Sequence, residues 1–122
     1  MSTHIIVKTQ FTGNHRYPDA PEEVKFLRDT HRHIFFVEVQ IEVFHDDREL
    51  EFIMVKRALN VMVQEFVADY RGTFSCEMVA RDIQKWAREN YPVPESAHPR
   101  TVRRVEVKVF EDNENGAYIK ED

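Results

Sequence analysis

Three histidines have the residue type and the spacing needed to hold a metal ion. His31 and His33 are two residues apart, at the start of a run in which apolar and polar residues alternate. Side chains at positions i and i+2 of a β-strand point to the same face, so both imidazoles are expected on one side of that strand. His15, at the start of the preceding loop, supplies a third imidazole. Three nitrogen ligands that leave one position open are typical of a catalytic zinc site.

Four segments alternate between apolar and polar residues, as strands with one buried face do. These segments are residues 4–11, 32–44, 102–110 and 117–120. The loop over residues 12–30 has no period and is long for a chain of this size, which is typical of a functional or disordered connection. A hairpin turn is expected around residues 112–116, before the last strand.

Two helices are expected between the second and third strands. The first covers residues 52–67, because apolar residues recur there at steps of three and four. These are Phe52, Val55, Leu59, Met62, Val63 and Phe66. Ser75 is the expected N-cap of the second helix, which ends before the prolines of residues 91–99. The order β-β-α-α-β-β predicts one α+β domain over residues 1–122, a four-stranded antiparallel sheet with two helices on one face.

Composition narrows the classes of partner. The 122 residues carry a formal net charge of −5, and the longest basic cluster is Arg103-Arg104, so we expect no nucleic-acid partner. A run of about 18 apolar residues, which a membrane-spanning helix needs, does not occur in the sequence. The single cysteine, Cys76, and the lack of an apolar leader at the start favour the cytoplasm.

The sheet face away from the helices is expected to carry large aromatic residues among charged ones. These aromatic residues are Phe36, Phe44, Phe110 and Tyr118. Such a face, together with the open edges of a four-stranded sheet, is suited to pairing with further copies of the chain. We therefore expect a homo-oligomer that closes into a β-barrel.

Five short segments follow one another along nearly the whole chain. They are NHRYP with His15, THRHIFFVEVQIEV with His31 and His33, LEF at 50–52, SCEMVARDI, and VRRVEVKVFEDNENGAYI. Taken in this order, they resemble the 6-pyruvoyl-tetrahydropterin synthase and 6-carboxytetrahydropterin synthase family, which has the tunnelling (T) fold. The resemblance implies Zn²⁺ as cofactor, a pterin as small-molecule substrate, and a homohexamer of stacked trimers with the substrate between subunits.

The resemblance also implies roles for single residues. The three histidines match the zinc ligands of the family. Glu111 matches the carboxylate that accepts hydrogen bonds from the ring N–H and amino group of the pterin, a bidentate fit. We expect this carboxylate to close the cavity from a neighbouring copy of the chain. Ser75 and Cys76 match residues whose backbone lies along the edge of the ring.

Both parts of the family's proton-transfer machinery are missing from this sequence. The position of the family's cysteine falls at Phe26 or Leu27, and its Asp-His pair is replaced by Val67-Ala68. A positioned acid or base contributes roughly 10²–10⁴-fold in rate, so we expect little of the usual lyase activity. The candidates for a substitute acid or base are Asp29, Lys25 and Asp69.

The sequence thus predicts a zinc-binding, pterin-synthase-like protein that acts on or binds a pterin or a related bicyclic heterocycle. A non-catalytic oligomer that captures such a metabolite in the same cavity is the alternative. A purely structural oligomer with vestigial histidines is a third. Cys76 is interpreted as a buried structural residue, although the N-terminus of a helix can lower the pKa of a thiol.

Overall fold

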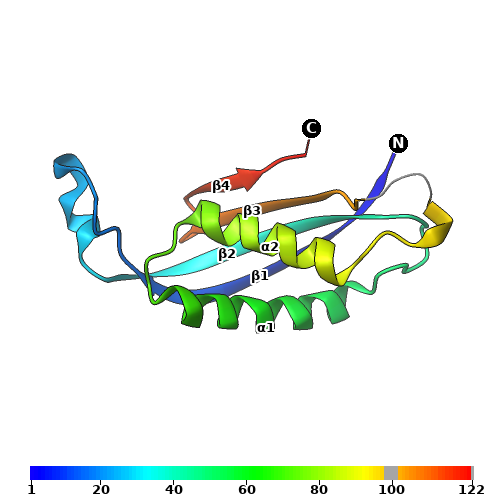
Figure 1. Ribbon diagram of the computed structural model, residues 1–122, viewed down its shortest axis with the longest axis horizontal. Coiled ribbons are helices and arrows are strands. Elements are labelled where there is room, and N and C mark those ends of the chain that lie inside the picture. The colour runs from blue at the N-terminus through cyan, green and yellow to red at the C-terminus, as the bar shows by residue number, and fades with distance from the viewer. Residues whose placement is uncertain (98–101, 122) are drawn as a thin grey trace.

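The computed structural model describes residues 1–97 and 102–121, and in it four strands form one antiparallel sheet in the order β1-β2-β3-β4 (Figure 1). The strands are β1 Thr3–His15, β2 His31–Val43, β3 Val105–Glu111 and β4 Asn115–Ile119. The helices are η1 Glu22–Arg28, α1 Phe52–Tyr70, α2 Cys76–Asn90 and η2 Glu95–Ala97, of which η1 and η2 are 3-10 helices. The order of strands and α-helices confirms the α+β arrangement expected from the sequence.

Both α-helices cover the same face of the sheet, and the core lies between the two layers. Helix α1 packs over β1, whereas α2 packs over β3 and β4 (Figure 1). The sheet contributes Val7, Phe11, Phe35, Val37, Val39, Ile41, Val105, Val107 and Val109 to the core. The helices contribute Val55, Leu59, Val63, Phe66, Val79, Ile83 and Ala87. Each large aliphatic or aromatic side chain buried here stabilises the fold by about 1.5–3 kcal/mol, so the strand ends are held on a rigid layer.

Strand β1 continues four residues past its expected end and pairs with β2 as far as His15. Gly13 lets the strand pass close to two rings, because a Cβ at this position would lie 3.0 Å from Phe74 Cζ and 3.1 Å from Phe35 Cε2. His15 is therefore the last residue of a strand, not the first residue of a loop. The following residues form an arm that contains η1 and projects beyond the end of the sheet, away from both chain termini (Figure 1).

Helix α1 is three residues longer than expected and ends where Arg71 and Gly72 adopt left-handed backbone angles, with φ of 50° and 85°. Asp69 consequently lies in the last turn of the helix, where its side chain is exposed. Phe52 was expected in the core, but it is 56% exposed, and the buried stripe of α1 begins one turn later at Val55.

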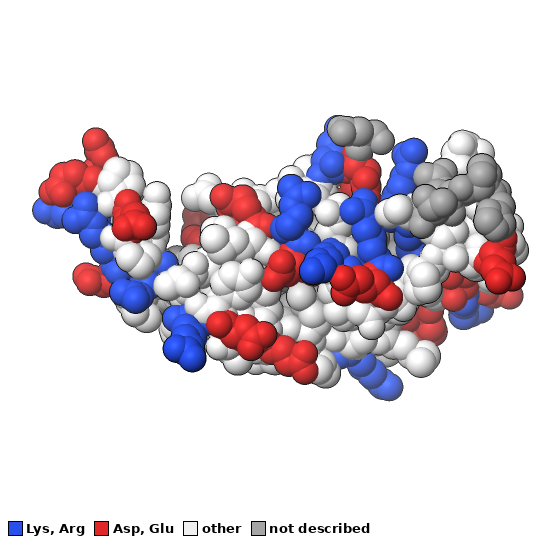
Figure 2. All heavy atoms as spheres, viewed as in Figure 1, with Lys and Arg blue, Asp and Glu red and all other residues white. Residues whose placement is uncertain are grey.

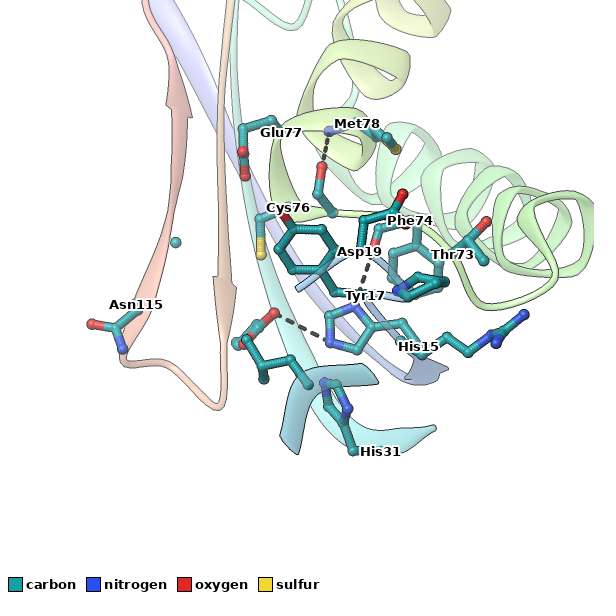
Figure 3. A pocket seen from close by; sticks show the side chains of 16 residues that line it. His15, Tyr17, Asp19, His31, Thr73, Phe74, Cys76, Glu77, Met78 and Asn115 are labelled. Atoms are coloured by element: carbon teal, nitrogen blue, oxygen red, sulfur yellow. Dashed lines mark hydrogen bonds and ion pairs between the residues drawn. The ribbon is translucent and has the colours of Figure 1, made fainter. Parts of the chain in front are cut away.

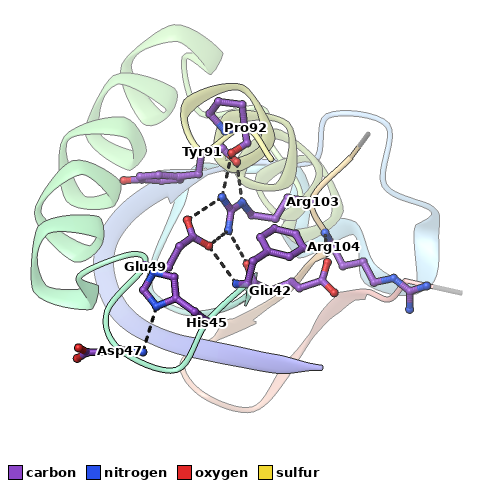
Figure 4. Close-up of polar contacts among 9 residues, drawn as sticks. Glu42, His45, Asp47, Glu49, Tyr91, Pro92, Arg103 and Arg104 are labelled. Carbon is purple, nitrogen blue, oxygen red and sulfur yellow. Dashed lines mark hydrogen bonds and ion pairs between the residues drawn. The ribbon is translucent and has the colours of Figure 1, made fainter. Parts of the chain in front are cut away.

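At the end of the sheet opposite to His15, Arg103 is almost completely buried, with 2% of its surface exposed. Its guanidinium donates hydrogen bonds to both carboxylate oxygens of Glu49 (Figure 4). It also donates to the carbonyl oxygens of Glu42, Tyr91 and Pro92. This network ties the residues before β3 to the segments that follow β2 and α2. Strand β3 begins after this network, at Val105, whereas the alternation in the sequence indicated a strand from residue 102.

The outer face of the sheet carries aromatic residues among charged ones, as expected. Phe36 lies opposite Phe110 across β2 and β3, and Tyr118 is 46% exposed. Phe44 does not belong to this group, because it follows the end of β2. Its ring packs under the guanidinium of Arg103, whose Cζ lies 5.0 Å from the ring centroid. Within the described residues, no helix is both long and apolar enough to cross a membrane.

Candidate metal centre and adjoining cavity

His15, His31 and His33 come together where the β1–β2 pair ends. His15 lies opposite His31 in the strand register, and Gly13 lies opposite His33. All three histidines are on the face that carries Phe35, so their rings gather on the helix-covered side. The ring centroid of His31 lies 4.5 Å from that of His15 and 4.9 Å from that of His33. One ligand atom of each histidine lies within 4.8 Å of the other two, an arrangement that could hold a metal ion.

Each of the three imidazoles hydrogen-bonds to an oxygen atom through Nδ1. The oxygen atoms are the carbonyl of Phe74 for His15 at 2.9 Å, the carbonyl of Asp29 for His31 at 2.8 Å, and Asp112 Oδ2 for His33 at 2.6 Å. A carbonyl or carboxylate oxygen can only accept, so each Nδ1 carries the hydrogen. In a neutral imidazole the lone pair is then on Nε2, the nitrogen left for a metal ion.

His15 is the most buried of the three residues, with 6% of its surface exposed. Its ring packs against Phe35 and Phe74, with centroids 5.2 Å from each. Burial lowers the pKa of His15 below its ordinary value of 6.5, so the ring is neutral at pH 7. Within the part of the chain that the structure describes, the buried Nε2 of His15 has no hydrogen-bond partner. A buried polar atom without a partner costs free energy, which makes this nitrogen the most informative atom of the site.

Glu111 is the last residue of β3 and lies opposite Phe35, on the face of the histidines. Its Oε1 is 3.3 Å from His15 Nε2, and its Oε2 is 3.7 Å from His33 Nε2. The neutral ring of His15 has no hydrogen on Nε2 to donate, so two electron-rich atoms face each other at the contact between His15 Nε2 and Glu111 Oε1. Glu111 belongs to the same chain as the histidines. The expectation that this carboxylate comes from a neighbouring copy is therefore wrong.

A cavity of about 710 Å³ opens beside His15 and His31 (Figure 3). It is lined on one side by the arm, including Tyr17 and Leu27, and on the other by the start of α2. Figure 2 shows the molecule hollowed between the arm and the body, with acidic and basic side chains interspersed over this face. The volume is in the range of small-molecule sites, so the histidine cluster has room for a ligand next to it.

The three residues expected to bind a ring, Glu111, Ser75 and Cys76, all line this cavity. Ser75 is the N-cap of α2, as expected, and its Oγ accepts the N–H of Met78 at 3.2 Å. Burial and the carboxylates of Glu111 and Glu77 raise the pKa of the Cys76 thiol to about 12. The thiol therefore stays protonated at neutral pH, which argues against a nucleophilic role.

The three candidates for a substitute acid or base are not among the residues that line the cavity. Lys25, on η1, is 66% exposed and lies 3.3 Å from Glu22. Asp69 is exposed on α1. Asp29 contributes its backbone carbonyl to His31, whereas its side chain is exposed. In the described part of the chain, the carboxylate that faces the Nε2 atoms of His15 and His33 is that of Glu111.

The connection between the two α-helices positions the carbonyl that binds His15. The carbonyl of Gly72 accepts the N–H of Arg16 at 2.6 Å, which joins this connection to the end of β1. A Cβ at Gly72 would lie 3.1 Å from the carbonyl oxygen of Asn14, and the φ of 85° disfavours any other residue. Phe74 follows two residues later and is thereby held over His15.

Asp112 is a site residue that the sequence analysis missed. Its carboxylate binds His33 and also accepts the N–H of Ile34 at 3.0 Å. These two hydrogen bonds hold the pKa of Asp112 below its ordinary value, and the bond from the Ile34 N–H has the larger effect. The sequence indicated only a turn at this position. The contact with His33 depends on the β2–β3 register, which joins segments far apart in the chain.

Comparisons of the sequence with family models and with curated proteins found no match. The structure itself defines the class of protein: an α+β fold with a three-histidine cluster that could hold a metal ion. A cavity large enough for a small molecule adjoins this cluster.

Proposed function

We propose that the chain binds zinc through the Nε2 atoms of His15, His31 and His33, and that the adjoining cavity acts on or binds a pterin or a related bicyclic heterocycle. The observation that carries the proposal is the pair of electron-rich atoms, His15 Nε2 and Glu111 Oε1, 3.3 Å apart. A cation beside both atoms would satisfy both. Three imidazoles suit zinc, whereas calcium and magnesium prefer oxygen ligands.

Zinc bound there would act as a Lewis acid on an oxygen atom of the substrate. Glu111 would accept two N–H groups of the heterocycle side by side, as a carboxylate can. The protonated thiol of Cys76 and the apolar wall formed by Leu27 would shield the ring from water. Glu111 lies next to both the metal ligands and the cavity, so it would hold the ring beside the metal.

We further propose that the chain has the T fold and assembles into a hexamer of stacked trimers around a β-barrel. The element order and the five sequence segments support the fold. The sheet order leaves β1 and β4 as open edges. Together with the aromatic outer face, these edges support the assembly.

A binding protein without catalysis is the second candidate function. Leu27, one of two positions aligned with the family's cysteine, lines the cavity but offers no proton-transfer group. Cys76 is protonated, and the three other candidate acids or bases lie outside the cavity. This arrangement favours capture of the heterocycle over its conversion.

Metal analysis tests the zinc site. Purified protein, stripped with a chelator, supplied with zinc and dialysed, is expected to retain about one zinc per chain, the stoichiometry of a single three-histidine site. His31→Ala should retain far less. His45→Ala is the matched control, because His45 is exposed and outside the cluster. Zinc in His31→Ala at the wild-type level would contradict the proposed site.

Thermal denaturation with and without ligand then tests the cavity. A pterin at 100 times its Kd should stabilise the zinc-loaded protein by about 2.7 kcal/mol, because it binds only the folded state. Incubation with dihydroneopterin triphosphate separates the two candidates. Release of triphosphate would indicate an enzyme, and stabilisation without turnover would indicate a binding protein. The absence of both responses would contradict a pterin ligand.

A further inference from the structure

The turn between β3 and β4 is unusually specific in the residues it accepts. The N–H of Glu114 donates to the carbonyl of Glu111 at 2.9 Å, which leaves Asp112 and Asn113 as the two central residues. Both have positive φ, of 51° and 59°. Turns in which both central residues have positive φ favour asparagine, aspartate and glycine, the residues that tolerate left-handed backbone. The turn by itself therefore explains why one of these three types stands at position 112.

The turn directs Asp112 back toward strand β2. Its N–H donates to the carbonyl of Ile34 at 2.7 Å, and its Oδ1 accepts the N–H of Ile34 at 3.0 Å. Its Oδ2 lies 2.6 Å from His33 Nδ1. Both carboxylate oxygens and the backbone N–H are thus engaged. The side chain is held in one orientation, with an acceptor aimed at the histidine.

His33 differs from the other two histidines in the kind of partner that its Nδ1 has. The side chain of His33 is 22% exposed, against 8% for His15, so packing restrains its ring less. Its Nδ1 partner is a side-chain carboxylate, whereas His15 and His31 use backbone carbonyls. A carboxylate partner fixes the tautomer of a histidine ligand, orients its ring and raises its basicity.

We propose that Asp112 is a positioning residue of the metal centre: it holds His33 in the tautomer and orientation that present Nε2 to the metal. Asp112 does not contact the metal itself. The inference rests on the proposed zinc site. It explains why position 112 holds aspartate in particular, which the turn alone does not require. Asparagine or glycine would satisfy the turn equally well, but neither offers an acceptor that matches the Nδ1–H of His33 without losing the bond to Ile34.

Asp112→Asn is the decisive variant, because it preserves the size, the left-handed backbone and an oxygen for the Ile34 N–H. The amide group then points its N–H toward His33 Nδ1 and favours the tautomer with the hydrogen on Nε2. The zinc Kd, measured by competition with a chelator, is expected to rise about 10–100-fold. Asp112→Gly should change the Kd in the same direction. The melting temperature of metal-free protein should change little, because Asp112 is exposed.

Asn113→Gly is the matched control, since it alters the other left-handed residue of the same turn without removing the carboxylate. Its zinc Kd should equal that of the wild type. A second readout is the ¹⁵N chemical shifts of His33 in metal-free protein, which report its tautomer. The wild type should show the hydrogen on Nδ1, and Asp112→Asn should show it on Nε2.

Wild-type zinc affinity in both Asp112 variants, or an unchanged His33 tautomer in Asp112→Asn, would overturn the inference. If the wild-type protein does not bind zinc, that result would instead contradict the proposed function. In that case the tautomer measurement still decides whether Asp112 controls His33. The two failures are therefore distinguishable.

Discussion

At the scale of single residues, the metal centre is defined by where each histidine nitrogen points. The alternation after His31 correctly placed His31 and His33 on one face of a strand, and all three histidines do come together. The partners of their Nδ1 atoms could not be predicted. Phe74 is 59 residues from His15, and Asp112 is 79 residues from His33. Contacts of this kind are set by tertiary packing, which periodicity along the sequence does not encode.

The role of Glu111 as a ring anchor can be tested with Glu111→Gln. The variant should retain zinc, because the three histidines remain, but it should bind a pterin about 10- to 100-fold more weakly. Hydrogen bonds to a charged acceptor contribute about 1.5–3 kcal/mol, and the amide offers a donor where the ring also presents one. Isothermal titration with the zinc-loaded protein measures the change. Glu114→Gln, an exposed carboxylate in the same turn, is the control. Equal affinities in Glu111→Gln and wild type would exclude the anchor role.

At the scale of elements, the sequence predicted every strand and both α-helices but misplaced several of their ends. Strand β1 was expected to end at residue 11, because residues 12–30 show no alternation, whereas the missing Cβ of Gly13 lets the strand pass beside Phe35 and Phe74. Strand β3 was expected to begin at 102, because Arg103 could not be recognised as a buried residue. In both cases a contact with a distant element decides the boundary.

The network around Arg103 should contribute strongly to stability. Arg103→Leu would remove the guanidinium that donates to the carboxylate of Glu49 and to three carbonyl oxygens. Removing one partner of a buried ion pair costs about 3–5 kcal/mol, so urea denaturation should show a loss of this size. Arg104→Leu makes the same substitution at an exposed neighbouring position and should cost much less. A similar loss for both variants would mean that the buried network is not the cause.

The same network predicts an acid-sensitive contribution to stability. Burial alone would raise the pKa of Glu49, but the hydrogen bonds and charge of Arg103 outweigh it and hold the pKa below its ordinary value of 4.5. As the pH falls below 4.5, Glu49 takes up a proton more readily in the unfolded state than in the folded state. The contribution of the ion pair to stability is therefore present above pH 4.5 and is lost as the pH falls below it. Glu49→Gln should therefore be less stable than wild type at pH 7, and the difference should shrink below pH 4.5. A constant difference down to pH 3 would contradict the ion pair.

At the scale of the whole molecule, the layer arrangement was predictable because it follows from alternation and helical periodicity. The outer face combines aromatic residues with ion pairs, such as Lys8 and Lys108 on either side of Glu38 at 3.8 and 3.6 Å. Such a mixed face fits either contact with another subunit or exposure to water. The assembly therefore needs a direct measurement.

Sedimentation velocity is expected to give a mass that is a multiple of the 14.6 kDa chain, as the proposed hexamer requires. Phe36→Glu should shift the mass toward that of the single chain, because it places a charge in the middle of the outer face opposite Phe110. Phe52→Glu, an exposed aromatic on α1, should leave the mass unchanged. A wild-type mass of one chain at micromolar concentration would remove the barrel.

The central claim is that His15, His31 and His33 hold a zinc ion between their Nε2 atoms. An anomalous difference map from a crystal grown with zinc, recorded on both sides of the zinc absorption edge, tests it most directly. We expect one strong peak per chain, about 2.0–2.1 Å from each of the three nitrogens. A map with no peak among the three imidazoles, or with zinc bound only at surface carboxylates, would contradict the claim.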